Sequence, residues 1–375
     1  MQPIDPVTLA EKIIGLLDSS KYVATYKWAA LDAIIQIASE SVEDSGEAPS
    51  YISAKKVGTR VMEIYWRQAV PFTADETGKP IFLRQSNLGK NLDIPQIIAE
   101  YRKTMSLTAK NDSLDKARQL DPSGIGKLER EIQARVIGQP LSKLQRFGNG
   151  AKSSEDRFLF DFSWKDEESF GKIHKEGFDD SIRFLPGVAQ GLLRIQSLLR
   201  PYLENLWIQK VADQNRDITD AASLEDFLFG AERTTHTKIR PYLVKLQSNK
   251  CFYCENTFTG QIEVDHFLSF SKHRNESLDN LVASCRTCNG AKSDSYVSVR
   301  HLTKWTARFS LGEFSDELDS IAATTGYLRK SSELLKIARS VYFHKPVGLP
   351  LWDQSFGTVP LSYEEAHSAL DGHHP

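Results

Sequence analysis

The sequence has little of what stabilises secreted proteins or anchors proteins in membranes. Only 4 of its 375 residues are cysteines, and no stretch of eighteen uninterrupted apolar residues is present. The first thirty residues place Asp5, Glu11, Asp18 and Lys21 among short apolar runs, which differs from a secretory signal. We therefore expect a protein that does not span a membrane and that resides in the cytoplasm.

Other patterns are also missing. The chain has no internal repeat and no low-complexity tract, and it lacks a Gly-x-x-x-x-Gly-Lys-Ser/Thr phosphate loop. Any control driven by nucleotide hydrolysis would therefore have to come from another subunit. The net charge of -2 argues against a chain that is basic throughout.

Charge is unevenly distributed along the chain. Residues 231–310 contain 12 Lys and Arg against 7 Asp and Glu, a net charge of +5. All other residues together contain 35 basic and 42 acidic side chains, a net charge of -7. A basic region is what binding to a polyanion requires, so we expect nucleic acid to bind the C-terminal third.

Most of the chain shows apolar residues at helical spacing. This spacing predicts helices within residues 6–41 (two, broken near residues 18–20), 54–70, 94–103, 124–135, 187–213 and 240–247. The predicted fold class is therefore α+β, with a mainly helical N-terminal region followed by a small C-terminal domain.

An aromatic stripe interrupts the helical pattern. Phe158, Phe160, Phe162 and Trp164 alternate with other residues, which predicts a strand over residues 157–164. The stripe could serve as a platform for stacked bases, but aromatic side chains at this spacing are more often part of a core. We expect core packing.

All four cysteines lie in one segment, as Cys251-x-x-Cys254 and Cys285-x-x-Cys288. In each pair a tight turn directs two sulfurs toward one point, and two such turns supply the four ligands of a tetrahedral zinc site. The alternative is a disulfide or redox pair. The absence of a secretory signal and the presence of two pairs favour structural zinc.

A polar constellation lies between and after the cysteine pairs. An alternating strand over residues 261–266 ends in Asp265 and His266, and neighbouring residues in a strand point to opposite sides. A second short strand, residues 279–284, leads into Cys285. A helix is expected to begin near Asn289, one turn before Lys292.

Together these residues resemble the HNH, or ββα-metal, nucleases. The resemblance rests on Cys251-x-x-Cys254, Asp265-His266, Asp279-Asn280-Leu281, Cys285-x-x-Cys288-Asn289 and Lys292. It implies that Asp265 and Asn289 bind a divalent metal, that His266 is the general base, and that Asn280 holds the loop orienting His266. Many HNH proteins have histidine where this chain has Asn289. An amide oxygen suits Mg²⁺ (or Mn²⁺) better than imidazole does.

Several basic residues near this constellation could contact phosphate. Lys292 is the strongest candidate, and Lys272, Arg274 and Arg286 are further candidates, although each could equally be a solvated surface residue. The remaining histidines of the region, His236, His273 and His301, show no pattern that assigns them a role.

The sequence thus predicts four segments with different tasks. These are residues 1–150 (helical recognition or partner binding), 151–223 (linking subdomain), 224–310 (HNH nuclease with structural zinc) and 311–375 (helical extension and tail). We expect a metal-dependent endonuclease that nicks DNA, in the style of bacterial anti-phage defence nucleases that work with a partner protein. The alternative is a zinc-ribbon protein that binds nucleic acid without cutting it.

Overall fold

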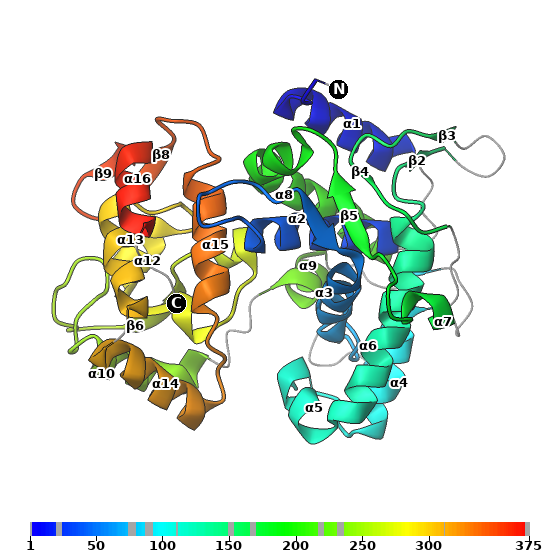
Figure 1. Cartoon of the computed structure of the whole chain (residues 1–375). Helices are drawn as coiled ribbons and strands as arrows, with labels where there is room; N and C mark the ends of the chain where they lie inside the picture. Colours follow the sequence, from blue (N-terminus) through cyan, green and yellow to red (C-terminus); the bar gives the residue numbers. More distant parts are fainter. Residues whose placement is uncertain are drawn as a thin grey trace. The chain divides into compact units, whose positions relative to one another are not determined.

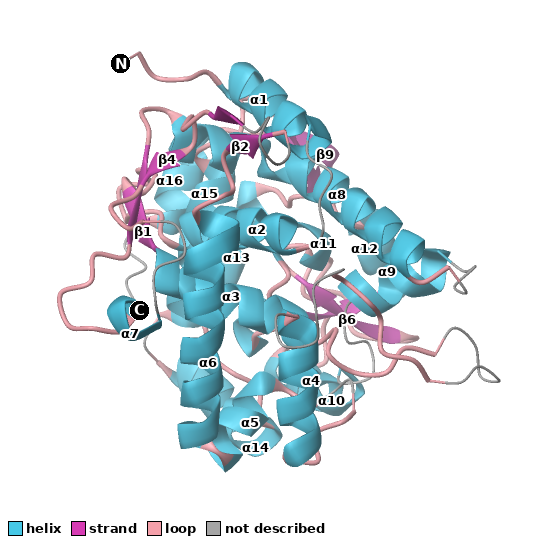
Figure 2. Ribbon diagram, turned by 90° about the vertical axis from the view of Figure 1, so that its right-hand side faces the viewer, coloured by secondary structure: helices cyan, strands magenta, loops and turns pink. Residues whose placement is uncertain are grey.

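The computed structural model describes residues 2–19, 25–73, 80–86, 93–109, 112–148, 154–165, 170–216, 221–230, 236–310 and 312–371. The chain forms two compact units: unit 1 comprises Met1–Ala38 and Pro49–Gly230, and unit 2 comprises Ser39–Ala48 and Ala231–Pro375. Helices predominate and the sheets are small, as Figures 1 and 2 show. None of the helices in the described ranges has the length and apolar character of a membrane span.

Unit 1 is mainly helical, as predicted. Its helices are α1 (Pro6–Ser19), α2 (Tyr26–Glu40, whose last two residues belong to unit 2), α3 (Ala54–Trp66), α4 (Ile94–Thr104), α5 (Leu114–Leu120), α6 (Pro122–Val136), the π-helical turn η2 (Ile137–Leu141), α7 (Phe170–Ile173), α8 (Val188–Gln214) and α9 (Ala221–Phe229). Side-chain caps fix the starts of α3, α5 and α6, as where Ser53 accepts from the backbone of Lys56 in α3. Gly58 of α3 lies so close to Gln133 of α6 that a Cβ would stand 2.7 Å from its Cα.

The sheets of unit 1 are short. Strands β1 (Tyr51–Ser53), β5 (Ser181–Phe184) and β4 (Phe160–Asp161) form an antiparallel sheet in the order β1-β5-β4, and β2 (Arg146–Phe147) pairs with β3 (Ser154–Glu155).

The strand predicted over residues 157–164 exists only as the two residues of β4. The buried side chain of Gln145 accepts from the amides of Leu159 and Phe160 and donates to the Phe160 carbonyl, and so occupies backbone groups that a longer ladder would use. The four aromatic side chains of the stripe are buried, which confirms the prediction that they form core.

Unit 2 contains the cysteines and the polar constellation. Its elements are α10 (His236–Leu246), β6 (Ile262–His266), α11 (Phe270–His273), the 3-10 turn η4 (Leu278–Asn280), β7 (Leu281–Cys285), α12 (Arg286–Lys292), α13 (Val299–Thr306), the 3-10 turn η5 (Ala307–Phe309), α14 (Glu313–Thr325), α15 (Ser331–Tyr342), β8 (Pro350–Asp353), β9 (Gly357–Pro360) and α16 (Tyr363–Leu370). The two strands predicted beside the cysteines are β6 and β7, which confirms the α+β class.

Strands β6 and β7 form a two-stranded antiparallel ribbon whose two faces differ. Its register pairs Val264 with Ala283 and His266 with Leu281. The apolar face, with Val264, Leu281 and Ala283, packs against Ile239 and Leu243 of α10. On the polar face Glu263 and Asp265 point toward α12 because alternate residues of a strand share a face.

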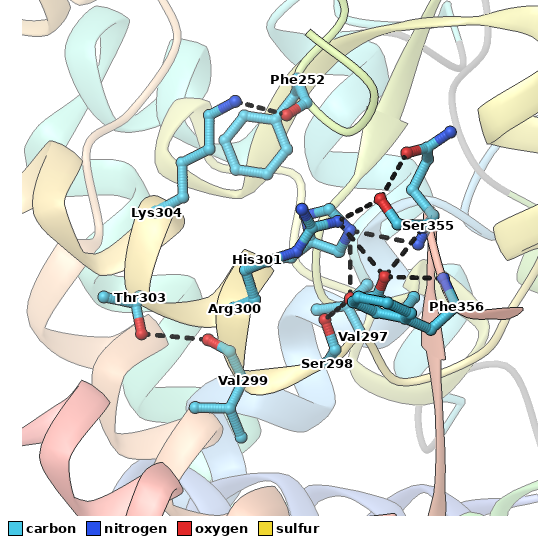
Figure 3. A network of polar contacts seen from close by, with 12 residues as sticks. Phe252, Val297, Ser298, Val299, Arg300, His301, Thr303, Lys304, Ser355 and Phe356 are labelled. Atoms are coloured by element: carbon cyan, nitrogen blue, oxygen red, sulfur yellow. Dashed lines mark hydrogen bonds and ion pairs between the residues drawn. The ribbon is translucent and has the colours of Figure 1, made fainter. Parts of the chain in front are cut away.

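Helix α13 anchors the first cysteine turn. Figure 3 shows the Lys304 ammonium reaching the carbonyl of Phe252, to which it donates at 2.7 Å. At the start of the helix, Ser298 Oγ donates to Asp353 Oδ2 at 2.5 Å, which ties α13 to the β8–β9 hairpin. The segment between the cysteines of the first pair is therefore fixed from outside the ribbon.

The segment Ser39–Ala48 completes unit 2 from the N-terminal part of the chain. Arg339 of α15 donates to Asp44 Oδ1 at 2.8 Å, and His344 Nε2 donates to the carbonyl of Gly46 at 2.8 Å. Gly46 has a φ of +86°, and a Cβ there would stand 2.3 Å from the Phe343 ring. This tight turn therefore requires glycine.

Candidate metal centres and active site

The four cysteines converge from two turns. Cys251 and Cys254 lie in a turn closed by an antiparallel bridge between Lys250 and Thr257. Cys285 caps the start of α12 and Cys288 lies in its first turn. The four sulfurs all lie within 4.8 Å of one another, and none of these cysteines forms a disulfide.

The chemistry of this group fits a structural zinc ion. Four sulfurs at one point are the closed tetrahedral donor set that zinc prefers. Burial raises the pKa of the Cys251 thiol, and the backbone amide of Cys285, which donates to Cys251 Sγ at 3.3 Å, opposes this effect. The four cysteines could therefore bind zinc, and their free state disfavours the disulfide alternative.

On the polar face, Asp265 is paired with a fully buried lysine. Lys292 Nζ lies 3.2 Å from Asp265 Oδ1 and 3.0 Å from Oδ2, and it also donates to the carbonyl of His266 at 2.8 Å. The hydroxyl of Tyr253 donates to Asp265 Oδ2 at 2.6 Å. Burial, followed by the charge of Asp265, raises the pKa of Tyr253 well above its usual value, so the hydroxyl stays protonated and donates.

Asn289 contacts a carboxylate to which the sequence pattern had assigned no role. Its Nδ2 donates to Glu263 Oε2 at 2.5 Å. Asn289 and Lys292 are one helical turn apart on α12 and face Glu263 and Asp265, two residues apart on β6. The position of Glu263 two residues before Asp265 in a predicted strand indicates that both carboxylates lie on one face, and this pattern could have identified Glu263 from the sequence. The structure thus gives Asp265 and Asn289 separate partners on one face.

The donors on the polar face suit a hard cation. Asp265, Asn289 and Glu263 offer carboxylate and amide oxygens, which Mg²⁺ prefers. A cation at Asp265 would share that carboxylate with Lys292 and Tyr253. The assignment of Asp265 and Asn289 as a magnesium pair stays a prediction, with Glu263 as an additional donor.

His266 lies on the opposite face, next to two residues that the sequence did not single out. Its Nε2 lies 2.9 Å from Glu276 Oε2, and His236 Nε2 lies 3.1 Å from the same oxygen. Burial alone raises the pKa of Glu276, but hydrogen bonds from His236 and His266 and their charges outweigh burial and hold that pKa well below its usual value. Glu276 is therefore an ionised acceptor. We call these three residues the histidine–glutamate cluster.

Asn280 fixes the loop that follows β6. Its Oδ1 accepts from the Leu268 amide at 2.8 Å, and its Nδ2 donates to the carbonyls of Leu268 and Asn275, each at 2.9 Å. The side chain is fully buried. These bonds hold both ends of the segment between His266 and Glu276, which is the role that the resemblance assigns to Asn280.

The four predicted phosphate contacts lie in different surroundings. Lys292 is fully buried, and its two partners favour a structural role. Lys272 Nζ lies 3.3 Å from Asp294 Oδ2 and over the ring of Tyr296. Arg274 ends α11 in the left-handed conformation and is partly exposed. Arg286 is exposed and donates to Gln261. Their contacts with phosphate stay predictions.

His301 behaves as a structural histidine. Its ring packs edge-on against Tyr253 and stacks on Trp352. Burial, aided by the charge of Arg300, lowers the pKa of His301 to about 4. The imidazole is therefore neutral at neutral pH and packs as part of the core, beside the residue that donates to Asp265. His273 is also buried.

Comparison with known proteins identifies the segment that holds these residues. Residues 251–295 match the family model described as HNH endonuclease, which confirms the resemblance. No curated protein and no solved structure matches the chain. The match begins at Cys251 and so includes His266 and Glu276 but excludes His236.

Proposed function

We propose that this chain, whose residues 251–295 match the HNH endonuclease family, is a metal-dependent enzyme that hydrolyses phosphodiester bonds in DNA. The observation that supports catalysis best is the hydrogen bond from His266 to Glu276. A purely structural zinc ribbon has no need of an imidazole fixed by an ionised carboxylate at the end of a strand.

The hydrogen bond defines which nitrogen of His266 can act as a base. Because Glu276 is ionised, it only accepts, so the proton on His266 is at Nε2. In the neutral imidazole the lone pair then lies on Nδ1. Nδ1 is the atom that would take the proton of the attacking water, while Glu276 stabilises the imidazolium that forms.

The polar face would supply the remaining requirements of hydrolysis. Asp265, Asn289 and Glu263 would hold a divalent cation, and such an ion neutralises charge on the scissile phosphate when bound. Lys292 maintains the orientation of Asp265 from within the fold. Arg286, Lys272 and Arg274 would bind flanking phosphates, in keeping with the net charge of +5 in residues 231–310.

DNA is the proposed substrate. The proposed product is nicked DNA, because a single site of this kind cuts one strand at a time. We also propose a role in anti-phage defence with a partner protein. This proposal is based on the arrangement of the chain, in which an HNH segment is joined to a large helical region. The competing function is nucleic-acid binding without cleavage. A cleavage assay with supercoiled plasmid, linear, single-stranded and modified phage DNA in Mg²⁺ or Mn²⁺ separates these possibilities.

His266→Ala tests the proposal directly. Loss of the base should lower cleavage by roughly a hundredfold or more, while zinc content and DNA binding persist. Glu276 keeps His236 as a partner, so stability should fall by no more than about 1–3 kcal/mol. His367→Ala, which changes a histidine of α16 that stacks on Phe343, is the matched control. Cleavage by His266→Ala at the wild-type rate would refute the mechanism.

A further inference from the structure

The histidine–glutamate cluster combines three metal-ligating groups from three different segments of unit 2. His236 is the first residue of α10, His266 is the last residue of β6, and Glu276 lies between α11 and η4. One potential ligand atom from each lies within 4.8 Å of the other two. His236 lies outside the residues that match the HNH family, so the family match does not account for the cluster.

The distances suit a shared ion. Ligands bound at 2.0–2.1 Å to a tetrahedral ion lie roughly 3.3 Å apart. His266 Nε2 and His236 Nε2 lie 2.9 and 3.1 Å from Glu276 Oε2, so only small movements would open room for an ion. The ring centroids of the two histidines lie 5.1 Å apart in an edge-to-face arrangement.

The loop that carries Glu276 is already fixed. Asn280 donates to the carbonyl of Asn275, and Asn275 Oδ1 accepts from the amide and hydroxyl of Ser277. His236 is fixed by α10, whose Ile239 and Leu243 are fully buried against the ribbon. A preorganised set of ligands loses little conformational entropy when it binds an ion.

We propose that His236, His266 and Glu276 form a second metal site, selective for a divalent transition ion such as Zn²⁺, Co²⁺ or Ni²⁺. Two imidazoles with one carboxylate favour such ions over Mg²⁺, which prefers oxygen ligands. The site is chemically distinct from the four thiolates, and its ion would be held more weakly because it has fewer protein ligands.

Occupancy of this site would switch off the proposed base, a consequence that rests on the proposed function. An ion on His266 Nε2 replaces the proton there, and the neutral ring must then carry its proton on Nδ1. Nδ1 would have no lone pair for the attacking water. A transition ion would therefore inhibit cleavage that Mg²⁺ supports.

Cobalt binding tests the site without any requirement for catalysis. The full-length chain with its zinc bound is titrated with Co²⁺ by calorimetry and by visible absorption. His373 and His374 are both replaced by alanine in every protein compared, because adjacent histidines near a terminus could bind cobalt themselves. With excess Mg²⁺ present to occupy the proposed site on the polar face, we expect one cobalt per chain, with the spectrum of nitrogen and oxygen ligands and without a thiolate charge-transfer band.

Two variants and one control define the ligands. His236→Gln and Glu276→Gln should each weaken cobalt binding at least about tenfold, whereas His367→Gln should leave it unchanged. Zinc content and circular dichroism establish whether each variant is folded. If one of the two variants does not fold, the other is sufficient to test the ligands. The proposal is overturned if the wild-type protein binds no cobalt beyond its zinc site, or if folded variants bind it with unchanged affinity.

Inhibition provides the second readout. Micromolar Co²⁺ should lower Mg²⁺-dependent cleavage by the wild-type protein, and His236→Gln should be less inhibited relative to its own cobalt-free rate. A protein that binds cobalt through these residues but never cleaves DNA would refute the proposed function and leave the metal site standing.

Discussion

The two faces of the β6–β7 ribbon differ in what holds them together. On the apolar face, α10 buries aliphatic side chains against Val264 and Leu281, and the polar histidine–glutamate cluster lies only at the end of the strand. On the polar face, α12 contacts β6 through charged and amide groups, with Lys292 on Asp265 and Asn289 on Glu263.

The difference shows how adjacent residues acquire different chemistry. Asp265 and His266 are neighbours in sequence, yet the pleat directs one toward a buried ammonium and the other toward an ionised carboxylate. A strand that ends between two unlike helices can therefore keep the proposed base apart from the proposed cation site. The following changes test whether the two faces are as distinct as the contacts indicate.

The largest effect should come from Cys285→Ser, because Cys285 ends β7 and begins α12 and thus affects both faces. Three thiolates hold zinc poorly, and the binding energy of a structural zinc ion, about 10–16 kcal/mol in small zinc modules, contributes directly to folding. We expect loss of zinc, DNA binding and cleavage together, measured by elemental analysis and thermal unfolding. Thr287→Ser, an exposed change in the same turn, should retain all three.

Lys292→Met should damage only the polar face. The change leaves Asp265 buried without a countercharge, and such a loss costs about 3–5 kcal/mol. Urea unfolding should show this destabilisation, and adding Asp265→Asn should restore much of it. If Lys292→Met instead keeps full stability and weakens DNA binding, the lysine contacts phosphate and the structural interpretation is wrong.

His301 should make the stability of unit 2 depend on pH. Its pKa falls from about 6.5 in the unfolded chain to about 4 in the folded protein, so unfolding takes up a proton as the pH drops below 6.5. Stability should decline by about 3 kcal/mol between pH 6.5 and 4. His301→Phe should flatten this part of the profile. If His301→Phe has the same dependence of stability on pH as the wild-type protein, a group other than His301 causes the acid sensitivity.

The smallest effect should come from Arg286→Ala, on the exposed side of α12. Loss of one phosphate contact should weaken DNA binding uniformly across sequences and reduce the salt slope by about one, with stability unchanged. Lys245→Ala, an exposed change in the last turn of α10, removes the same charge elsewhere. Equal salt slopes for the two variants would show that Arg286 has no special contact.

Local features of the molecule could be predicted from the sequence because they depend on spacing. Two residues between paired cysteines already place their sulfurs together, and alternation already separates Asp265 from His266. The longer helices of unit 1 follow for the same reason, whereas the short helices α5, α7 and α9 were not predicted. The approach of Cys251 to Cys285 could also be predicted, because the sequence predicted both strands of the ribbon that connects the two cysteine pairs.

Features that depend on tertiary packing could not be predicted. His236 approaches His266 only because α10 packs on the ribbon, and no spacing in the sequence indicates this. One helical turn relates Lys292 to Asn289, but only the fold decides that Lys292 is buried on Asp265. The side chain of Gln145 bonds to the backbone of Leu159 and Phe160, so β4 is shorter than the strand that the alternation over residues 157–164 predicts.

The segment Ser39–Ala48 has a consequence for the synthesis of the protein. Arg339 bonds to Asp44 across 295 residues of chain, and His344 bonds to Gly46 across 298. Closing a loop of this length carries an entropic cost, and the partners cannot meet until the chain has been synthesised beyond residue 344. Unit 2, which contains the residues that match the HNH family, therefore cannot be completed before residue 344 is made, and a product starting near residue 224 would lack its turn at Gly46. Partly synthesised chains would therefore lack a complete unit 2.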